Sequence, residues 1–181
     1  MCASAAPSLA TPATLATIAA TLGQKLTAAG WMVVTAESCT GGMIATTLTD
    51  IAGCSAWFER AYVTYSNEAK STAIGVSGEL IALHGAVSEP VAKAMAQGAL
   101  AASVADVSVA VTGIAGPGGG SAEKPVGTVC FAWSTHVSQT VIRTRHFAGD
   151  RAEIRRQATQ YAMEGLNEVL DAASKQAPTT T

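Results

Sequence analysis

The sequence predicts an α/β protein: a three-layer α/β/α sandwich with a mixed, mostly parallel sheet, built as a single domain. Apolar runs of strand length alternate with longer segments whose apolar residues recur at helical spacing, which indicates helices on both faces of one sheet. A pair of strand-like runs near the end of the chain is joined by a short connection, which is typical of an antiparallel pair. The length of 181 residues suits one domain with a sizeable core.

Each expected element is marked by its own pattern and by residues that begin or end it. Gly30 suits a helix end, Ser88-Glu89-Pro90 has the serine, acid and proline of a helix start, and Asp150 caps the last helix. The domain is expected to span residues 12–174, between flexible ends at 1–11 and 175–181. In chain order the expected elements are a helix at 12–29, a strand at 32–36, a helix at 41–51, a strand at 61–65, short helices at 67–73 and 78–83, a helix at 88–102, strands at 107–112, 126–134 and 139–146, and a helix at 150–174.

Composition excludes several classes of protein. Hydrophobic residues make up 49% and charged residues 13%, which excludes a disordered chain. Every apolar run is shorter than the about 20 residues of a membrane span, so we expect no membrane association. A net charge of −2 with 11 Lys plus Arg gives no basic face, so we expect no nucleic-acid partner. The irregularly spaced cysteines and the lack of a signal-peptide pattern predict a cytoplasmic protein with reduced thiols.

A candidate nucleophile, Ser38, follows the first expected strand in the segment Glu37-Ser38-Cys39-Thr40-Gly41-Gly42. A strand–turn–helix exposes one side chain beside backbone N–H groups that favour developing negative charge, and glycines let the backbone approach a ligand closely. The alternative is a plain junction in which Ser or Thr only caps the helix. Cys39 is an alternative nucleophile, although a free cysteine more often fills an apolar core, and its side chain would point away from that of Ser38 on a strand.

A serine nucleophile needs a base, and the three histidines, at 84, 136 and 146, are scattered. Lys70 can serve if burial or a nearby cation lowers its pKa, and Arg151 is the candidate cation. Tyr65, expected at the end of the second strand, could project over the same rim. The alternative for Lys70 is a solvated surface charge.

The segment from Thr112 to Gly120 leaves the third expected strand with glycine at high density. Such a loop can turn several N–H groups into one cavity and form a nest for a phosphate or an oxyanion. It is not a phosphate-binding P-loop, because no Gly-Lys-Ser/Thr follows it. The alternative is a mobile surface loop.

Two further observations concern charge and metals. Arg151 opposes the dipole of the last helix, which hints at a phosphate or carboxylate clamp, whereas Arg155 and Arg156 are expected to be solvated or salt-bridged. The sequence contains no H-x-x-E-H, no H-x-H and no paired cysteines, so we expect neither a metal nor a cofactor.

The segments together resemble the C-terminal domain of the competence/damage-inducible protein CinA over residues 12–172. The resemblance is carried by motifs that occur in the family's order: Ala36-Glu37-Ser38-Cys39-Thr40-Gly41-Gly42, Tyr62-Val63-Thr64-Tyr65-Ser66-Asn67-Glu68-Ala69-Lys70, Gly85-Ala86-Val87-Ser88, Ala110-Val111-Thr112-Gly113-Ile114-Ala115-Gly116-Pro117, Lys124-Pro125-Val126-Gly127-Thr128 and Phe147-Ala148-Gly149-Asp150-Arg151. One departure is Glu59-Arg60-Ala61, where family members often carry glycines. The chain resembles the stand-alone form of the domain.

The resemblance implies a nicotinamide-nucleotide amidase, which converts nicotinamide mononucleotide and water to nicotinate mononucleotide and ammonia in a pyridine nucleotide salvage step. It places the family's catalytic residues on Ser38, Lys70, Tyr65, Thr112 and Arg151. The glycines expected to bind substrate are Gly41, Gly42, Gly113, Gly116, Gly118 and Gly119. We also expect a homo-oligomer, with a dimer favoured.

Two other functions stay open on the sequence. The chain could be a non-catalytic nucleotide-binding or regulatory module linked to competence or DNA damage, or a cysteine amidase that uses Cys39. A hydrogen bond between Ser38 and Lys70 in a pocket would favour the serine amidase over the regulatory module.

Overall fold

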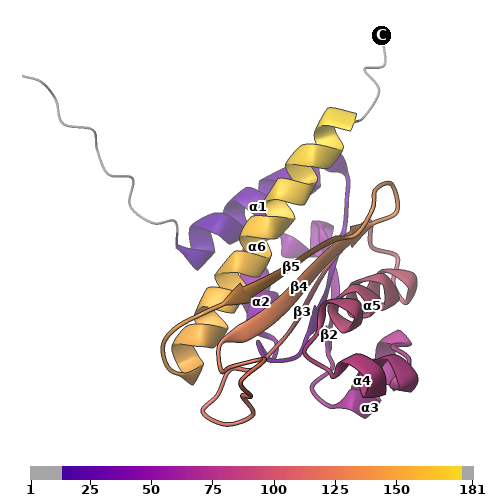
Figure 1. Ribbon diagram of the computed structural model, residues 1–181. Coiled ribbons are helices and arrows are strands. Elements are labelled where there is room, and N and C mark those ends of the chain that lie inside the picture. Colours follow the sequence, from indigo (N-terminus) through magenta and orange to yellow (C-terminus); the bar gives the residue numbers. More distant parts are fainter. Residues whose placement is uncertain (1–13, 177–181) are drawn as a thin grey trace, which may run out of the picture.

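Among residues 14–176, which the computed structural model describes, five strands form one sheet in the order β2-β1-β3-β4-β5 (Figure 1). The strands are β1 (Val33–Glu37), β2 (Phe58–Val63), β3 (Val107–Gly113), β4 (Thr128–Thr135) and β5 (Val141–His146). β1 pairs in parallel with β2 and β3, whereas β4 pairs antiparallel with β3 and β5. Within this sheet, β4 alone runs against the other strands, so the predicted mixed sheet is confirmed.

Helices cover both faces of the sheet (Figure 1). One face carries α1 (Leu15–Ala29), α2 (Met43–Thr49) and α6 (Arg151–Gln176), and the opposite face carries α3 (Asn67–Ile74), α4 (Gly78–His84) and α5 (Glu89–Ala101). A short 3-10 helix, η1 (Cys54–Ala56), precedes β2 and was not expected from the sequence. The predicted three-layer α/β/α sandwich is confirmed.

Alternation along the strands divides the core between the two helical layers. On β1, Val33 packs with α1, α2 and α6, while its neighbour Val34 packs with α3, α4 and α5. Because successive side chains on a strand point to opposite faces, a strand that is covered on both faces is apolar at most of its positions. All five residues of β1 are buried, which explains why a short unbroken apolar run predicted this strand.

Most expected elements agree with the structure to within a few residues, but the second strand was misplaced. It was expected at 61–65 and begins instead at Phe58, which pairs with Val33 of β1. Glu59 and Arg60 therefore belong to this edge strand, and Tyr65 lies beyond its end. The expected flexible end at 1–11 and most of the one at 175–181 lie outside the described residues, as do residues 12 and 13 of the first expected helix, whereas Lys175 and Gln176 belong to α6. No helix in the described part of the chain is long and apolar enough to span a membrane.

The chain order creates a crevice between β1 and β3. From β1 the chain passes through α2 to β2 on one side, and then through α3, α4 and α5 to β3 on the other side of β1. Neighbouring parallel strands whose connections leave in opposite directions form a switch point, and ligands bind there, at the carboxyl ends of the strands. Ser38 follows β1 directly, and Thr112 and Gly113 end β3.

A glycine sets how closely α3 packs on α5. A Cβ atom at Gly98 of α5 would overlap the backbone carbonyl of Ile74 at the end of α3. The carbonyl is part of the main chain and cannot move aside like a flexible side chain. Gly98 therefore holds α3, the helix that carries Lys70, against the core.

We expect Gly98→Ala to lower the free energy of unfolding by about 1–3 kcal/mol, the usual cost of overpacking a close contact. Gly78→Ala is the matched control, since Gly78 lies in α4 with open space around its Cβ position. Urea denaturation of both variants measures the difference. Equal stabilities would contradict the assigned role of Gly98.

Candidate active site

A cavity of about 210 Å³ lies at the carboxyl ends of β1 and β3. It brings together all the residues predicted to be catalytic, together with Gly113. The complete lining is Ser38, Cys39, Tyr65, Asn67, Lys70, Ala86, Val87, Thr112, Gly113, Ala115 and Arg151. None of the three histidines lines it.

Ser38 and Lys70 meet inside this cavity, with Lys70 Nζ 3.2 Å from Ser38 Oγ. Ser38 comes directly after β1, and its backbone N–H donates to the carbonyl of Val111 on β3. Lys70 lies in the first turn of α3. Ser66 caps the start of this helix, because its hydroxyl accepts a hydrogen bond from the backbone N–H of Ala69. The strand end and the helix start thus fix the two side chains independently.

The amine of Lys70 is buried, and only 1% of the residue is exposed. It donates to the backbone carbonyls of Thr64 at 2.9 Å and Tyr65 at 3.4 Å, and it makes no salt bridge among the described residues. Burial lowers the pKa of Lys70, because the charged ammonium loses the solvation it would have in water. Of the two causes that the sequence suggested, burial lowers the pKa of Lys70, and no effect of Arg151 on it is found.

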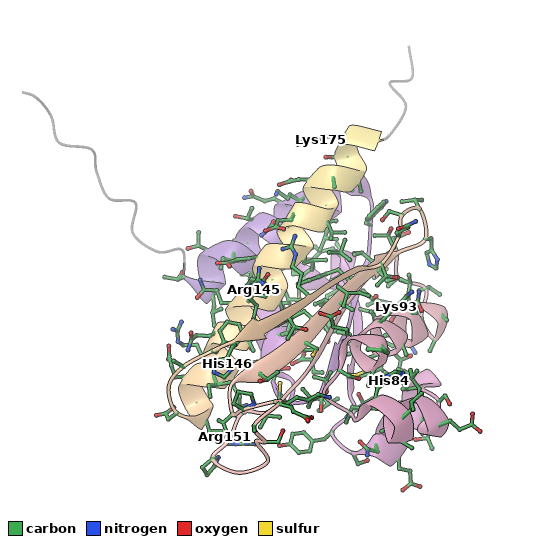
Figure 2. The ribbon with its side chains drawn as sticks, viewed as in Figure 1. His84, Lys93, Arg145, His146, Arg151 and Lys175 are labelled. Atoms are coloured by element: carbon green, nitrogen blue, oxygen red, sulfur yellow. The ribbon has the colours of Figure 1, made fainter. Side chains whose placement is uncertain are left out.

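Arg151 instead ties the two sides of the cavity mouth together. Its guanidinium donates to the hydroxyl of Tyr65 and to the backbone carbonyl of Gly116, both at 2.9 Å. Figure 2 labels Arg151, the first residue of α6, which lies beside the glycine-rich loop. An arginine that opposes the helix dipole therefore serves as a bridge between the Tyr65 segment and this loop.

The structure separates the glycines predicted to bind substrate. Gly113 lines the cavity, and the others are absent from its lining. The N–H of Gly41 donates to the carbonyl of Ser38, and that of Gly42 to the carboxylate of Glu37, so both are already engaged. The carbonyl of Gly116 accepts from Arg151, while Gly118 and Gly119 are exposed in the loop.

Thr112 is fixed by a backbone contact. Its hydroxyl donates to the carbonyl of Ala86 at 2.9 Å, which joins the end of β3 to the segment between α4 and α5. The oxygen keeps its acceptor capacity within the cavity wall.

Glu37 has a role that the sequence did not assign. Its side chain is fully buried and accepts hydrogen bonds from the backbone N–H groups of Gly42, Ile44 and Ala45 and from the hydroxyls of Thr35 and Thr40. These N–H groups form the amino end of α2. The helix terminus that was expected to favour charge on the substrate is therefore occupied by a carboxylate of the protein itself.

Arg155 was expected to be solvated or salt-bridged, and this expectation is wrong. Its Nε donates to the carbonyl of Cys39 at 3.0 Å and its Nη2 to that of Thr40 at 2.8 Å. It lies one helical turn after Arg151, so both arginines project from the same side of α6. That spacing was the one signal in the sequence for its position.

Cys39 lines the same cavity as Ser38, contrary to the expectation that its side chain points away. The expectation assumed strand geometry, but residues 38–40 form a turn after β1. Burial raises the pKa of the Cys39 thiol to about 12, so the nucleophilic thiolate is scarce at neutral pH.

Asn67 is a polar lining residue to which the sequence gave no role. It lies one helical turn before Lys70 on α3 and is exposed at the cavity. Its position in the motif was visible in the sequence, but a turn or a helix cap explained it equally well.

Fold and site together define the class: an α/β protein with a buried serine–lysine pair at the switch point of its parallel strands. Residues 15–170 match the CinA C-terminal domain. The chain belongs to this family.

Relatives of known name support the assignment. Nicotinamide-nucleotide amidohydrolase PncC of Escherichia coli K12 is 60% identical over 145 residues, covering 80% of this chain and 88% of the relative. A CinA-like protein of Syntrophobacter fumaroxidans is 53% identical over 149 residues, which are 82% of this chain but 35% of that longer protein. The crystal structure of a competence/damage-inducible protein from Agrobacterium tumefaciens superposes with a TM-score of 0.84 at 46% identity, over 88% of this chain and 97% of the other.

The reactivity of the cysteine thiols tests whether Cys39 is buried in the turn after β1. We expect an alkylating reagent at neutral pH to modify Cys54, which is partly exposed, much faster than Cys39. The rate at Cys39 should rise only as the pH approaches its raised pKa, because the thiolate is the reactive form. Peptide mapping by mass spectrometry follows each thiol, with the buried Cys130 as a control. Equal rates at Cys39 and Cys54 in the folded protein would refute the burial of Cys39.

Proposed function

We propose that this chain is a nicotinamide-nucleotide amidase that converts nicotinamide mononucleotide and water to nicotinate mononucleotide and ammonia. The observation that carries the chemistry is the contact between Lys70 Nζ and Ser38 Oγ inside the cavity. The substrate is proposed from the relatives, several of which are named nicotinamide-nucleotide amidohydrolases at 52–60% identity.

The surroundings of Lys70 support its role as the base. A neutral amine has two hydrogens and one lone pair, and the carbonyls of Thr64 and Tyr65 can accept the hydrogens while Ser38 donates to the lone pair. A charged ammonium has three hydrogens and can donate to the same three oxygens. A proton can therefore pass from Ser38 to Lys70 without a change of partners, and burial makes the neutral form accessible.

In the proposed reaction Ser38 Oγ attacks the carboxamide carbon as its proton moves to Lys70. The tetrahedral intermediate collapses when the carbon–nitrogen bond breaks, and the leaving nitrogen takes the proton from Lys70 and departs as ammonia. Water then attacks the acyl-enzyme ester, with Lys70 again accepting the proton. The bond between the carbon and Ser38 Oγ then breaks, Ser38 Oγ takes the proton back from Lys70, and the acid is released.

The oxyanion needs donors that the protein does not already use. The N–H groups of Gly41 and Gly42 are engaged, whereas among the described residues that of Cys39 donates no hydrogen bond. Cys39 follows the nucleophile and lines the cavity, a position that commonly supplies one oxyanion donor in serine hydrolases. We therefore assign the N–H of Cys39 to this role, with Gly113 on the facing strand end. Thr112 stays a proposed catalytic residue of the cavity wall, but its hydroxyl proton is already donated to the carbonyl of Ala86.

The remaining groups are assigned to substrate binding. Arg151 and Tyr65 close the mouth of the cavity, where the mononucleotide would extend outward. The loop with the buried Gly116 and the exposed Gly118 and Gly119 is proposed to take the phosphate.

Cellular context stays predicted in three respects. A cytoplasmic location accords with the unpaired thiols of Cys39, Cys54 and Cys130. A homo-oligomer, with a dimer favoured, stays a prediction. The absence of a cofactor, of a metal and of a nucleic-acid partner also stays a prediction.

Ser38→Ala is expected to abolish ammonia release from nicotinamide mononucleotide while leaving the fold intact, because among the described residues no other hydroxyl is hydrogen-bonded to Lys70 Nζ. Cys39→Ala is the matched control and should keep most of the activity. A coupled assay for ammonia measures both. Loss of activity in Cys39→Ala alone would assign the reaction to the thiol, and hydrolysis by neither the wild type nor its variants would favour the regulatory module.

Lys70→Ala should lower the rate by on the order of 10²-fold or more, within the range of a general base. Lys70→Arg should not restore it, because a guanidinium cannot release its proton at working pH. In the wild type the rate should rise with pH through a pKa below that of free lysine and then level off, because only the neutral amine accepts a proton. Substantial activity in Lys70→Arg would reduce Lys70 to an electrostatic role and leave Tyr65 as the next candidate base.

A further inference from the structure

The turn that carries Ser38 is held from opposite sides by charged side chains that do not line the cavity. Glu37 binds the N–H groups that follow the turn, and Arg155 binds its carbonyl groups. Neither residue is part of the cavity wall, so neither touches a substrate placed there.

The contacts of Glu37 use both carboxylate oxygens fully. One oxygen accepts from Gly42 N, Ile44 N and Thr40 Oγ1, and the other accepts from Ala45 N and Thr35 Oγ1, at 2.8–3.2 Å. The side chain is fully buried. A single group thus joins the last residue of β1 to the first turn of α2, on either side of Ser38.

Arg155 binds the carbonyl groups of the turn, whereas Glu37 binds its donors. Its planar guanidinium donates from two nitrogens to the carbonyls of Cys39 and Thr40, which directly follow Ser38. Gly41 makes room for this contact, since a Cβ there would lie 3.3 Å from Arg155 Nη2 on a backbone with φ of +61°. The left-handed backbone of Gly41 and the close approach of Arg155 together account for this glycine without a bound ligand.

We propose that Arg155 and Glu37 are positioning residues, which hold the turn so that Ser38 Oγ stays within hydrogen-bond distance of Lys70 Nζ. The activity readout of this inference rests on the proposed amidase function. Displacement of a reacting group by about 1 Å can cost on the order of 10²-fold in rate, so a clamp on the turn governs turnover without binding substrate.

Arg155→Ala tests the clamp, with Arg156→Ala as the matched control. Arg156 is the next residue on α6, is exposed, and bonds only Glu153 and Gln160 among the described residues. We expect kcat of Arg155→Ala to fall on the order of 10²-fold, with KM for nicotinamide mononucleotide within about twofold of wild type. Arg156→Ala should match wild type in both.

Added guanidinium separates positioning from a general loss of stability. At millimolar concentrations, far below those that denature proteins, it should restore part of the kcat of Arg155→Ala by occupying the vacated site, and it should leave wild type and Arg156→Ala unchanged. A wild-type kcat in Arg155→Ala, or a folded variant whose lost kcat guanidinium does not raise, overturns the proposal.

Conservative variants keep the test decisive if Arg155→Ala does not fold. In Arg155→Lys the ammonium keeps the charge but lacks the fork that reaches both carbonyls, so we expect kcat well below wild type. In Glu37→Gln the amide NH₂ must face a backbone donor in either orientation, Ala45 N in one and Gly42 N and Ile44 N in the other. Wild-type kcat in both variants overturns the proposal.

A substrate-independent readout distinguishes failure of this inference from failure of the proposed function. We expect a fluorophosphonate to label Ser38 in the folded wild type and in Arg156→Ala at equal rates, and more slowly in Arg155→Lys and Glu37→Gln. If the wild type does not hydrolyse nicotinamide mononucleotide, the proposed substrate fails while these rates still decide the positioning role. Equal labelling in all four proteins, or none in the wild type, contradicts it.

Discussion

Burial of the Lys70 amine is the constraint on which the rest of the site depends. A lysine with 1% exposure and no ionic partner among the described residues is costly to keep charged, so its surroundings must serve the neutral amine as well. The carbonyls of Thr64 and Tyr65 do this, because they lie beyond the end of β2 and no longer take part in the sheet. The early end of β2 is therefore part of the active site, and the close packing of α3 on α5 at Gly98 keeps the amine in place.

Each of the other charged side chains of the site makes hydrogen bonds to the protein itself. Glu37 accepts hydrogen bonds from the amino end of α2, and Arg155 binds the carbonyls of the turn that carries Ser38. Arg151 binds the hydroxyl of Tyr65 and the carbonyl of Gly116 in the loop after β3. Both arginines come from the start of α6, whose apolar side is anchored in the core by Ile154 and Ala158. One helix thus sets the relative positions of the turn that carries Ser38, the segment around Tyr65 and the loop after β3.

The sequence predicted the elements well where burial controls them and less well at an exposed edge. β1 and β3 are buried over nearly their whole length, and such apolar runs have few other interpretations. β2 is an edge strand whose first half contains Glu59 and Arg60, so composition hid where it begins. The meeting of Ser38 and Lys70 in one cavity was expected for two reasons. A serine nucleophile needs a base and the histidines are scattered, and the resemblance to the family placed its serine and lysine on these two positions.

Arg155 and Glu37 could not be predicted in the same way, because their partners are backbone atoms. Any residue at positions 39 and 40 presents the same carbonyls, so the identity of those residues carries no trace of the arginine 116 and 115 positions away. What the sequence does show is Gly41, which a ligand-binding interpretation explained equally well. The distinction between a glycine that admits substrate and one that admits a guanidinium lies in the fold alone, and it decides whether Gly41 contributes to the cavity or to the support of the turn that carries Ser38.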